Sequence, residues 1–127
     1  MNNWQVLEET LRYSITAPFA ARISHDKALK VGGHFIPDEV PILLATGVHL
    51  SDGKYFSYLD KFDPVQFSPV NEKKSPALAL ITLGIGARRC PGYHFSLYDV
   101  IIAVSILCKK YELWPAFDTD RFVVPIH

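Results

Sequence analysis

The sequence predicts a mainly α-helical fold with a small β region, and three observations support this class. Apolar residues recur at helical spacing over residues 3–13, and an almost wholly apolar run of helix length covers residues 93–113. Between them, residues 21–37 combine short β-prone runs with turn-forming residues. A hydrophobic content of 49% in 127 residues is enough for a folded core.

The first helix is predicted from Trp4, Leu7 and Leu11, which share one helical face and have polar residues between them. Pro18 ends this pattern, because the residue before a proline is pushed out of the helical region. We therefore expect an amphipathic helix that stops before Pro18.

The β region should follow directly. Residues 21–37 predict two short strands, in which Asp26-Lys27 turns the chain and Gly32-Gly33 opens a bend. Residues 40–50 are apolar enough for a buried strand or for the start of a helix, and periodicity alone does not decide between them.

A long loop and a second helix complete the predicted elements. Residues 51–80 hold many turn formers, including three prolines, and a long segment of this kind is commonly functional. Residues 93–113 predict a helix that is apolar on nearly every side, which is typical of a helix buried inside a larger protein. Residues 114–127 predict short strands and turns.

Charge and cysteine content exclude some classes of function. Thirteen basic and thirteen acidic residues cancel, so nothing supports nucleic-acid binding. Two cysteines, Cys90 and Cys108, do not make a disulfide framework, and a reducing compartment is expected. The N-terminus lacks a signal-peptide pattern, and the most apolar stretch, 95–108, is interrupted by Asp99 and too short to span a bilayer.

Cys90 lies in the segment whose residues best fit a ligand-binding site. Gly84 and Gly86 remove side chains where a flat ligand or another backbone could approach closely. Arg88 and Arg89 precede Cys90 and a helix is predicted just after it, and both features favour the thiolate form. A thiolate in such a setting suits a soft metal ligand.

The residues around Cys90 speak against two other roles for it. A lone cysteine is often a small buried hydrophobe, but the flanking glycines and arginines favour a ligand. A zinc site could use Cys90 and His94, yet two further ligands at plausible spacing are missing, although His25 and His49 exist.

Three motifs resemble those of the cytochrome P-450 family, in the family's order. Leu83–Gly92 resembles its haem-binding signature, with Gly86, Arg88, Cys90 and Gly92 on the fixed positions. Glu9–Arg12 resembles the Glu-x-x-Arg motif of the K helix, and Phe62–Phe67 resembles the Phe-x-Pro-x-Arg-Phe element. The resemblance covers nearly the whole chain.

The resemblance implies a cofactor and a role for each motif residue. The cofactor would be haem (iron protoporphyrin IX), with Cys90 as the axial thiolate ligand of iron. Haem-binding residues would be Arg88 and Arg22, as partners of the propionates, together with Leu83, Gly84, Gly86 and Gly92. Glu9, Arg12 and Gln66 would be structural.

Two residues depart from the family pattern. Leu83 stands where the family has a phenylalanine beside the thiolate, and Gln66 stands where it has an arginine. An amide can donate a hydrogen bond, but it lacks the charge and the fork of a guanidinium. Replacing Gln66 with arginine is therefore expected to stabilise the network with Glu9 and Arg12.

The resemblance also predicts the domain and the activity. Residues 1–127 would be the C-terminal part of a P-450 domain: the K helix, the β region, a long haem-flanking loop, the cysteine loop and the L helix. The parent would be a monooxygenase that inserts one oxygen atom from O2 into a small organic substrate, with electrons from a reductase or a ferredoxin-type protein. Residues 1–127 alone are expected to be inactive because the distal half of the haem pocket is missing.

The resemblance also leads to expectations about partners, location and an alternative function. No nucleic acid is expected as a partner, and a membrane only through an N-terminal anchor outside this chain. The parent would then lie at the endoplasmic reticulum membrane, facing the cytosol. The alternative function is a non-catalytic haem-binding or partner-binding remnant.

Overall fold

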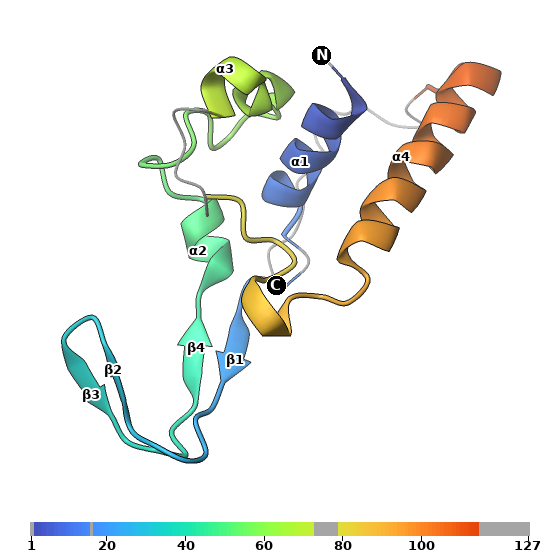
Figure 1. The fold of residues 1–127 in the computed structure, drawn as a ribbon. Coiled ribbons are helices and arrows are strands. Elements are labelled where there is room, and N and C mark those ends of the chain that lie inside the picture. Colours follow the sequence, from blue (N-terminus) through green and yellow to red (C-terminus); the bar gives the residue numbers. More distant parts are fainter. Residues whose placement is uncertain (1, 16, 73–78, 115–127) are drawn as a thin grey trace.

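The computed structural model describes residues 2–15, 17–72 and 79–114, which combine helices with two small antiparallel sheets (Figure 1). The fold is mainly α with a small β region, as predicted. In chain order the elements are α1 (Asn3–Tyr13), β1 (Ala20–Arg22), β2 (Leu29–Val31), β3 (His34–Ile36), β4 (Ile42–Leu44), α2 (Thr46–Leu50), the 3-10 turn η1 (Pro64–Phe67), α3 (Pro69–Glu72), the 3-10 turn η2 (Gly86–Arg88) and α4 (Tyr93–Lys110).

Helix α1 confirms the helix predicted over residues 3–13. Its start is fixed by a capping box: the Asn2 side chain accepts from the Gln5 N–H at 3.0 Å, and the Gln5 side chain accepts from the Asn2 N–H at 2.7 Å. One face of the helix is buried, and it includes Glu9 and Arg12 as well as Leu7. Burial of two charged side chains is unusual and indicates a paired site.

The β region contains one more strand than the sequence predicted for residues 21–37. Strands β2 and β3 form a hairpin whose turn, Gly32-Gly33, has φ values of +57° and +87° that favour glycine. Strand β1 pairs instead with β4, which places Ala20 opposite Leu44. The two-strand prediction was wrong because the partner of β1 lies about twenty residues further along the chain, where a local pattern cannot reveal it.

Residues 40–50 form both alternatives in succession, a strand and then a helix. Strand β4 is not buried, since Leu43 and Leu44 are exposed. Helix α2 lies against the link between α1 and β1, where the Gly47 N–H donates to the Pro18 carbonyl at 2.7 Å. The contact is so close that a Cβ atom on Gly47 would lie 2.9 Å from the Pro18 Cβ.

The irregular segment after α2 surrounds the main apolar cluster among the described residues. Leu50, Phe56 and Ala79 are buried together. The partly buried residues packed against them are Ile15, Tyr55, Leu59, Phe67 and Leu80. The loop predicted over residues 51–80 therefore wraps a core; it contains η1 and α3, and residues 73–78 of it lie outside the described part.

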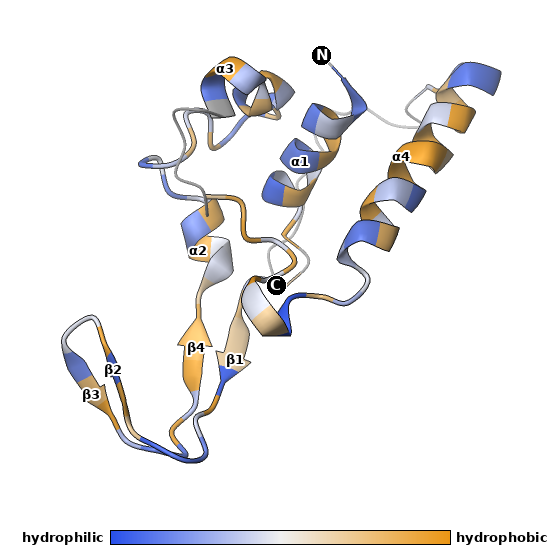
Figure 2. Ribbon diagram, viewed as in Figure 1, coloured by the Kyte–Doolittle hydropathy of each residue, from blue (hydrophilic) through white to orange (hydrophobic). Residues whose placement is uncertain are grey.

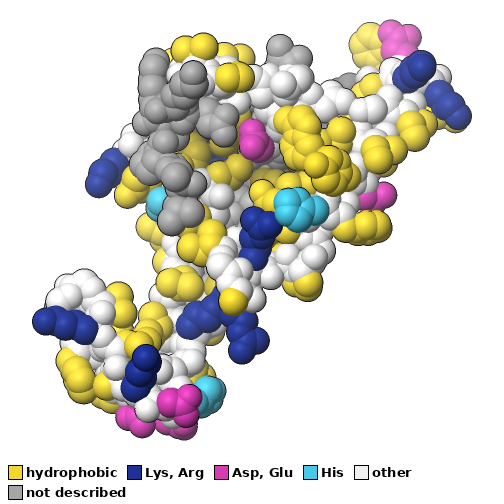
Figure 3. All heavy atoms as spheres, viewed as in Figure 1, with side chains coloured by type: hydrophobic (Ala, Val, Ile, Leu, Met, Phe, Trp, Pro, Cys, Tyr) yellow, Lys and Arg dark blue, Asp and Glu magenta, His cyan; other side chains and the backbone are white. Residues whose placement is uncertain are grey.

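Helix α4 ends three residues before the predicted helix end. It contacts α1 through a hydrogen bond of 2.6 Å from Asn3 Nδ2 to Ser105 Oγ and an edge-to-face pair of Trp4 with Tyr98. Leu97 is its only buried residue. Figure 2 marks many apolar residues along this helix, and Figure 3 shows apolar side chains on the face turned to the viewer. The burial expected for this helix is therefore not provided by the described residues of the chain.

Two sequence expectations concern the chain end and the membrane. The strands and turns predicted for residues 114–127 fall almost entirely outside the described residues. Among the described residues, no helix combines the length and the apolar character that crossing a membrane requires.

The Gly47–Pro18 contact leads to a stability prediction. Alanine normally favours a helix over glycine, but Gly47→Ala would force Pro18 away and is expected to destabilise the protein by about 1–3 kcal/mol. The matched control is Gly53→Ala, whose Cβ would meet only the Leu59 Cδ1 atom at 3.8 Å. Urea unfolding would contradict the prediction if Gly47→Ala were as stable as Gly53→Ala.

Candidate functional site

A buried ion pair connects two residues on one turn of α1. Arg12 donates from Nε to Glu9 Oε2 at 2.7 Å and from Nη2 to Glu9 Oε1 at 2.9 Å. Glu9 is fully buried and Arg12 is 3% exposed. A buried pair of this kind needs further hydrogen bonds to offset the loss of hydration.

Backbone groups of the long segment supply those bonds. The Asp63 N–H donates to Glu9 Oε1 at 2.8 Å, so one carboxylate oxygen is shared between α1 and the segment. The guanidinium of Arg12 also faces three carbonyl oxygens at 3.4–3.5 Å, those of Leu50, Tyr58 and Lys61. The pair therefore fastens residues 50–63 to the buried face of α1.

Gln66 completes the network from η1. Its Nε2 donates to Glu9 Oε2 at 2.9 Å, so the amide reaches the same carboxylate as Arg12. In the described parts of the chain, every buried side-chain nitrogen or oxygen atom has a hydrogen-bond partner. The structure thus brings together the three residues predicted to be structural, Glu9, Arg12 and Gln66. At position 66 the donor is a neutral amide.

The cysteine segment forms a closed turn. The Cys90 N–H donates to the Leu83 carbonyl at 3.0 Å, and the Arg89 N–H donates to the Gly86 carbonyl at 3.1 Å. Gly84 and Gly86 have φ values of +78° and +66°, which side-chain-bearing residues rarely adopt. The glycines are therefore required by the backbone of the turn, and at Gly86 a Cβ atom would meet no atom within 4 Å.

Cys90 presents a free, exposed thiol at the end of this turn. Its carbonyl accepts from the Tyr93 N–H at 3.1 Å, which leads the chain into α4. A Cβ atom on Gly92 would lie 3.9 Å from the sulfur, so glycine leaves the space beside it open.

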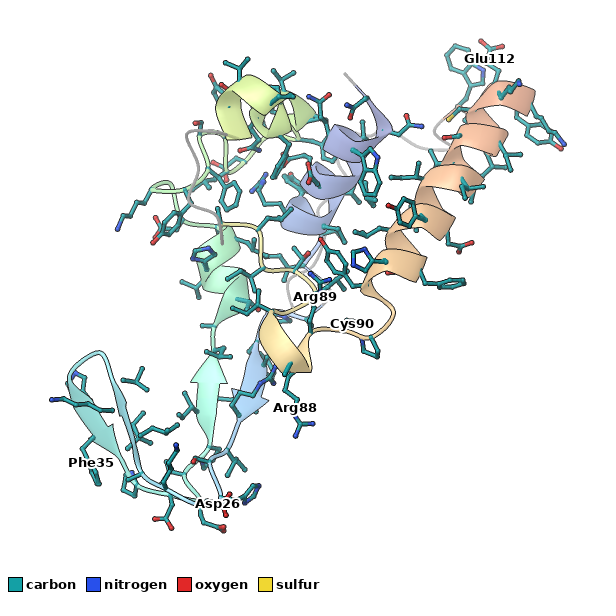
Figure 4. All side chains as sticks on the ribbon, viewed as in Figure 1. Asp26, Phe35, Arg88, Arg89, Cys90 and Glu112 are labelled. Carbon is teal, nitrogen blue, oxygen red and sulfur yellow. The ribbon has the colours of Figure 1, made fainter. Side chains whose placement is uncertain are left out.

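The two arginines before Cys90 extend to different sides of the turn. Both arginines are exposed, but Arg88 points away from the helices, whereas Arg89 points toward the space between α1 and α4 (Figure 4). The Arg89 guanidinium lies 4.0 Å from the centre of the Tyr93 ring and donates to His94 Nε2 at 3.0 Å. These contacts of Tyr93 and His94 with Arg89 were not predicted from the sequence, where His94 was considered only as a zinc ligand; a spacing of four and five residues across a helix start was the only signal for them.

The other predicted haem-binding residues lie at the edges of this region. Arg22 is exposed at the end of β1, where its guanidinium donates to the Ala21 carbonyl at 2.7 Å and not to the cysteine turn. The Leu83 side chain helps to line a cavity of about 220 Å³ between the turn, α1 and α4. Arg89 and Tyr93 line the same cavity.

The side chains around Cys90 fit a metal-containing macrocycle better than a bare metal ion. Across the described ranges, no group of three or more His, Cys, Asp and Glu side chains is placed to hold a metal ion. One exposed thiol, a glycine-lined turn and an exposed guanidinium at Arg88 instead fit a flat, anionic macrocycle that brings its own metal. The chemistry of these groups therefore agrees with haem.

Comparison with known proteins gives a consistent family. The family model described as Cytochrome P-450 matches residues 4–121. Probable cytochrome P-450 508A1 of Dictyostelium discoideum is 32% identical over 108 residues, which is 85% of this chain and 22% of that relative. Cytochrome P-450 6B2 of Helicoverpa armigera is 30% identical over 119 residues, covering 92% of this chain and 23% of the relative.

A third relative is the mitochondrial sterol 26-hydroxylase of Oryctolagus cuniculus, 30% identical over 120 residues. The match covers 91% of this chain and 22% of that protein. The chain thus spans less than a quarter of each of these relatives. With the family model matching most of its length, the chain belongs to the cytochrome P-450 family.

Proposed function

We propose that this chain is the thiolate-bearing part of a haem monooxygenase, with Cys90 as the axial ligand of the iron. The observation that carries the proposal is the free, exposed Cys90 thiol at the end of a turn closed by the bond from its N–H to the Leu83 carbonyl. On this proposal α1 is the K helix of the family, α4 is its L helix, and the described residues form a proximal part of the haem pocket.

Each group has a separate task in this arrangement. Bound haem supplies oxygen chemistry at iron, and a thiolate ligand favours O–O cleavage by donating electron density. Cys90 would hold the iron, and Gly86 and Gly92 would allow the macrocycle to approach the backbone. Arg88 would bind one propionate through a charge-assisted hydrogen bond, and Arg22 would bind the other.

The Glu9 network has an indirect role in this arrangement. It fixes residues 50–63 against α1, and these residues bury the cluster of Leu50, Phe56 and Ala79. Ala79 is four residues before Leu83, whose carbonyl closes the cysteine turn. The network therefore supports the start of the turn and takes no part in the chemistry.

The parent reaction that we propose is the insertion of one oxygen atom from O2 into a small organic substrate. The name of the rabbit relative, a sterol hydroxylase, is consistent with this class of reaction. Electrons would come from a reductase or a ferredoxin-type protein, and a membrane would be contacted through an N-terminal anchor outside this chain. The parent would then face the cytosol from the endoplasmic reticulum membrane.

A second candidate function is a non-catalytic haem-binding or partner-binding remnant. The exposed apolar residues of α4 favour it, because they leave a large surface for a partner. Large exposed residues of this helix are Phe95, Tyr98, Val100, Ile102, Val104, Ile106 and Leu107.

The proposed ligand is tested by replacing each cysteine in a complete P-450 domain that carries these residues. We expect Cys90→Ser to remove the long-wavelength thiolate band of the reduced, carbon-monoxide-bound protein, because a hydroxyl does not replace a thiolate as a soft ligand. Cys108→Ser is the matched control, since Cys108 is also free and exposed. A thiolate band that survives in Cys90→Ser contradicts the assignment.

The donor at position 66 is tested by two replacements. Gln66→Leu removes a hydrogen bond to the buried Glu9 carboxylate and should lower the free energy of unfolding by about 1–3 kcal/mol. Gln66→Arg restores the family residue with a charge-assisted bond and should raise both stability and haem occupancy. If Gln66→Arg unfolded at a lower urea concentration than the unchanged protein, the surroundings of residue 66 would be adapted to the amide and the prediction for arginine would be wrong.

Residues 1–127 alone are expected to bind haem weakly and to show no monooxygenase activity. The apolar wall that excludes water from the other side of the iron is not formed by the described residues, so activated oxygen would be lost to side reactions. The measurement is turnover of general probe substrates after reconstitution with haem and a reductase. Turnover that disappears in Cys90→Ala would overturn this expectation and make the chain an enzyme by itself.

A further inference from the structure

The junction between the cysteine turn and α4 has no side-chain cap. The residue at the cap position is Gly92, which has no side chain, and the first turn of α4 contains no acidic residue. The first amide groups of a helix lack partners within the helix, so an uncapped start is easily displaced. Whatever fixes this junction also fixes Cys90, two residues before it.

Arg89 makes the side-chain contacts that cross this junction. It belongs to the cysteine turn, while its two partners, Tyr93 and His94, belong to the first turn of α4. The guanidinium is 4.0 Å from the centre of the Tyr93 ring and 3.0 Å from His94 Nε2. The rings of Tyr93 and His94 are themselves packed edge-to-face, with centres 5.0 Å apart.

The position of Arg89 needs such partners. A cation near the N-terminus of a helix is repelled by the positive end of the helix dipole, so the exposed Arg89 guanidinium stays beside this helix start only if other contacts hold it. The ring face of Tyr93 and the lone pair of His94 offset that repulsion. Arg88 lacks a ring partner of this kind and extends to the opposite side of the turn (Figure 4).

We propose that Arg89, Tyr93 and His94 form a clasp that holds the cysteine turn in register with α4 and so sets the direction of the Cys90 sulfur. Arg89 and His94 are then positioning residues for the iron ligand and have no direct contact with haem. The proposal rests on the proposed role of Cys90. The backbone bonds on either side, from the Tyr93 N–H to the Cys90 carbonyl and from the Ser96 N–H to the Gly92 carbonyl, are the geometry that the clasp maintains.

The clasp is tested in a haem-loaded P-450 domain that carries these residues, through the share of total haem that gives the thiolate band with carbon monoxide. His94→Leu removes the acceptor of the Arg89 hydrogen bond. The ratio of haem with a thiolate ligand to haem without one should then fall by about fivefold, which is the change in an equilibrium constant that one ordinary hydrogen bond produces. His94→Gln offers an oxygen acceptor and should restore most of the band. His34→Leu, at an exposed position of β3, is the matched control and should leave the band unchanged.

Tyr93 provides an independent pair of variants and a readout without haem. Tyr93→Phe keeps the ring under the guanidinium and should retain the band, whereas Tyr93→Leu should lose it to the same degree as His94→Leu. In the haem-free domain, amide hydrogen exchange at residue 93 should accelerate in His94→Leu and return toward the unchanged rate in His94→Gln.

The outcomes separate this inference from the proposed function. An unchanged band in His94→Leu, or an equal loss in His94→Gln and His94→Leu, overturns the clasp. If His94→Leu does not fold, equal bands in Tyr93→Phe and Tyr93→Leu overturn it instead. A band that persists in Cys90→Ser would show that the assignment of the ligand is at fault, whereas its loss there with no effect at His94 would reject the clasp alone.

Discussion

The buried carboxylate of Glu9 is the constraint on which most of this structure depends. A charge without access to water must be matched inside the protein, and Glu9 is matched by Arg12, by the Asp63 N–H and by Gln66. These donors come from two parts of the chain: α1, and the irregular segment, in which Asp63 directly precedes η1 and Gln66 lies within it. Their hydrogen bonds hold the irregular segment against α1, which gives an otherwise loop-like region a defined path.

Helix α1 connects this network to the cysteine turn. Glu9 and Arg12 face the long segment, while Trp4 and Asn3 contact α4 through Tyr98 and Ser105. Leu83 and Arg89 lie across a small cavity from the same helix. The polar network and the cysteine turn thus share one support, although no residue of the network touches Cys90 in the described structure.

Local patterns predicted the elements whose partners are close in sequence. The helix at residues 3–13, the Gly32-Gly33 turn and the glycine positions of the cysteine turn depend on neighbouring residues. The pairing of β1 with β4 and the strand-to-helix change within residues 40–50 depend on distant ones. Two prolines of the predicted loop, Pro64 and Pro69, were correct turn signals, yet each of them begins a short helical turn.

In the candidate site, too, some features could be predicted from the sequence and others needed the fold. The spacing of Gly86, Arg88 and Cys90 was recognised in the sequence through its resemblance to the family's motif, and the positive φ value of Gly86 now gives a physical reason for the glycine. The different directions of Arg88 and Arg89 were not recognised, since adjacent arginines look identical until the helix start beside them is known. The contact from Gln66 to Glu9 needed the fold as well, because it crosses 57 residues.

The hairpin of β2 and β3 has a different consequence. It extends away from the helices (Figure 1), and Phe35 on it is 75% exposed. Its cross-strand bonds are its own, and at its base the Glu39 N–H donates to the Ser24 carbonyl. An isolated two-stranded hairpin is marginally stable in water, so it opens as a local unit at little cost to the remainder. The Gly32-Gly33 tip is therefore where the chain would tolerate an inserted loop or label best.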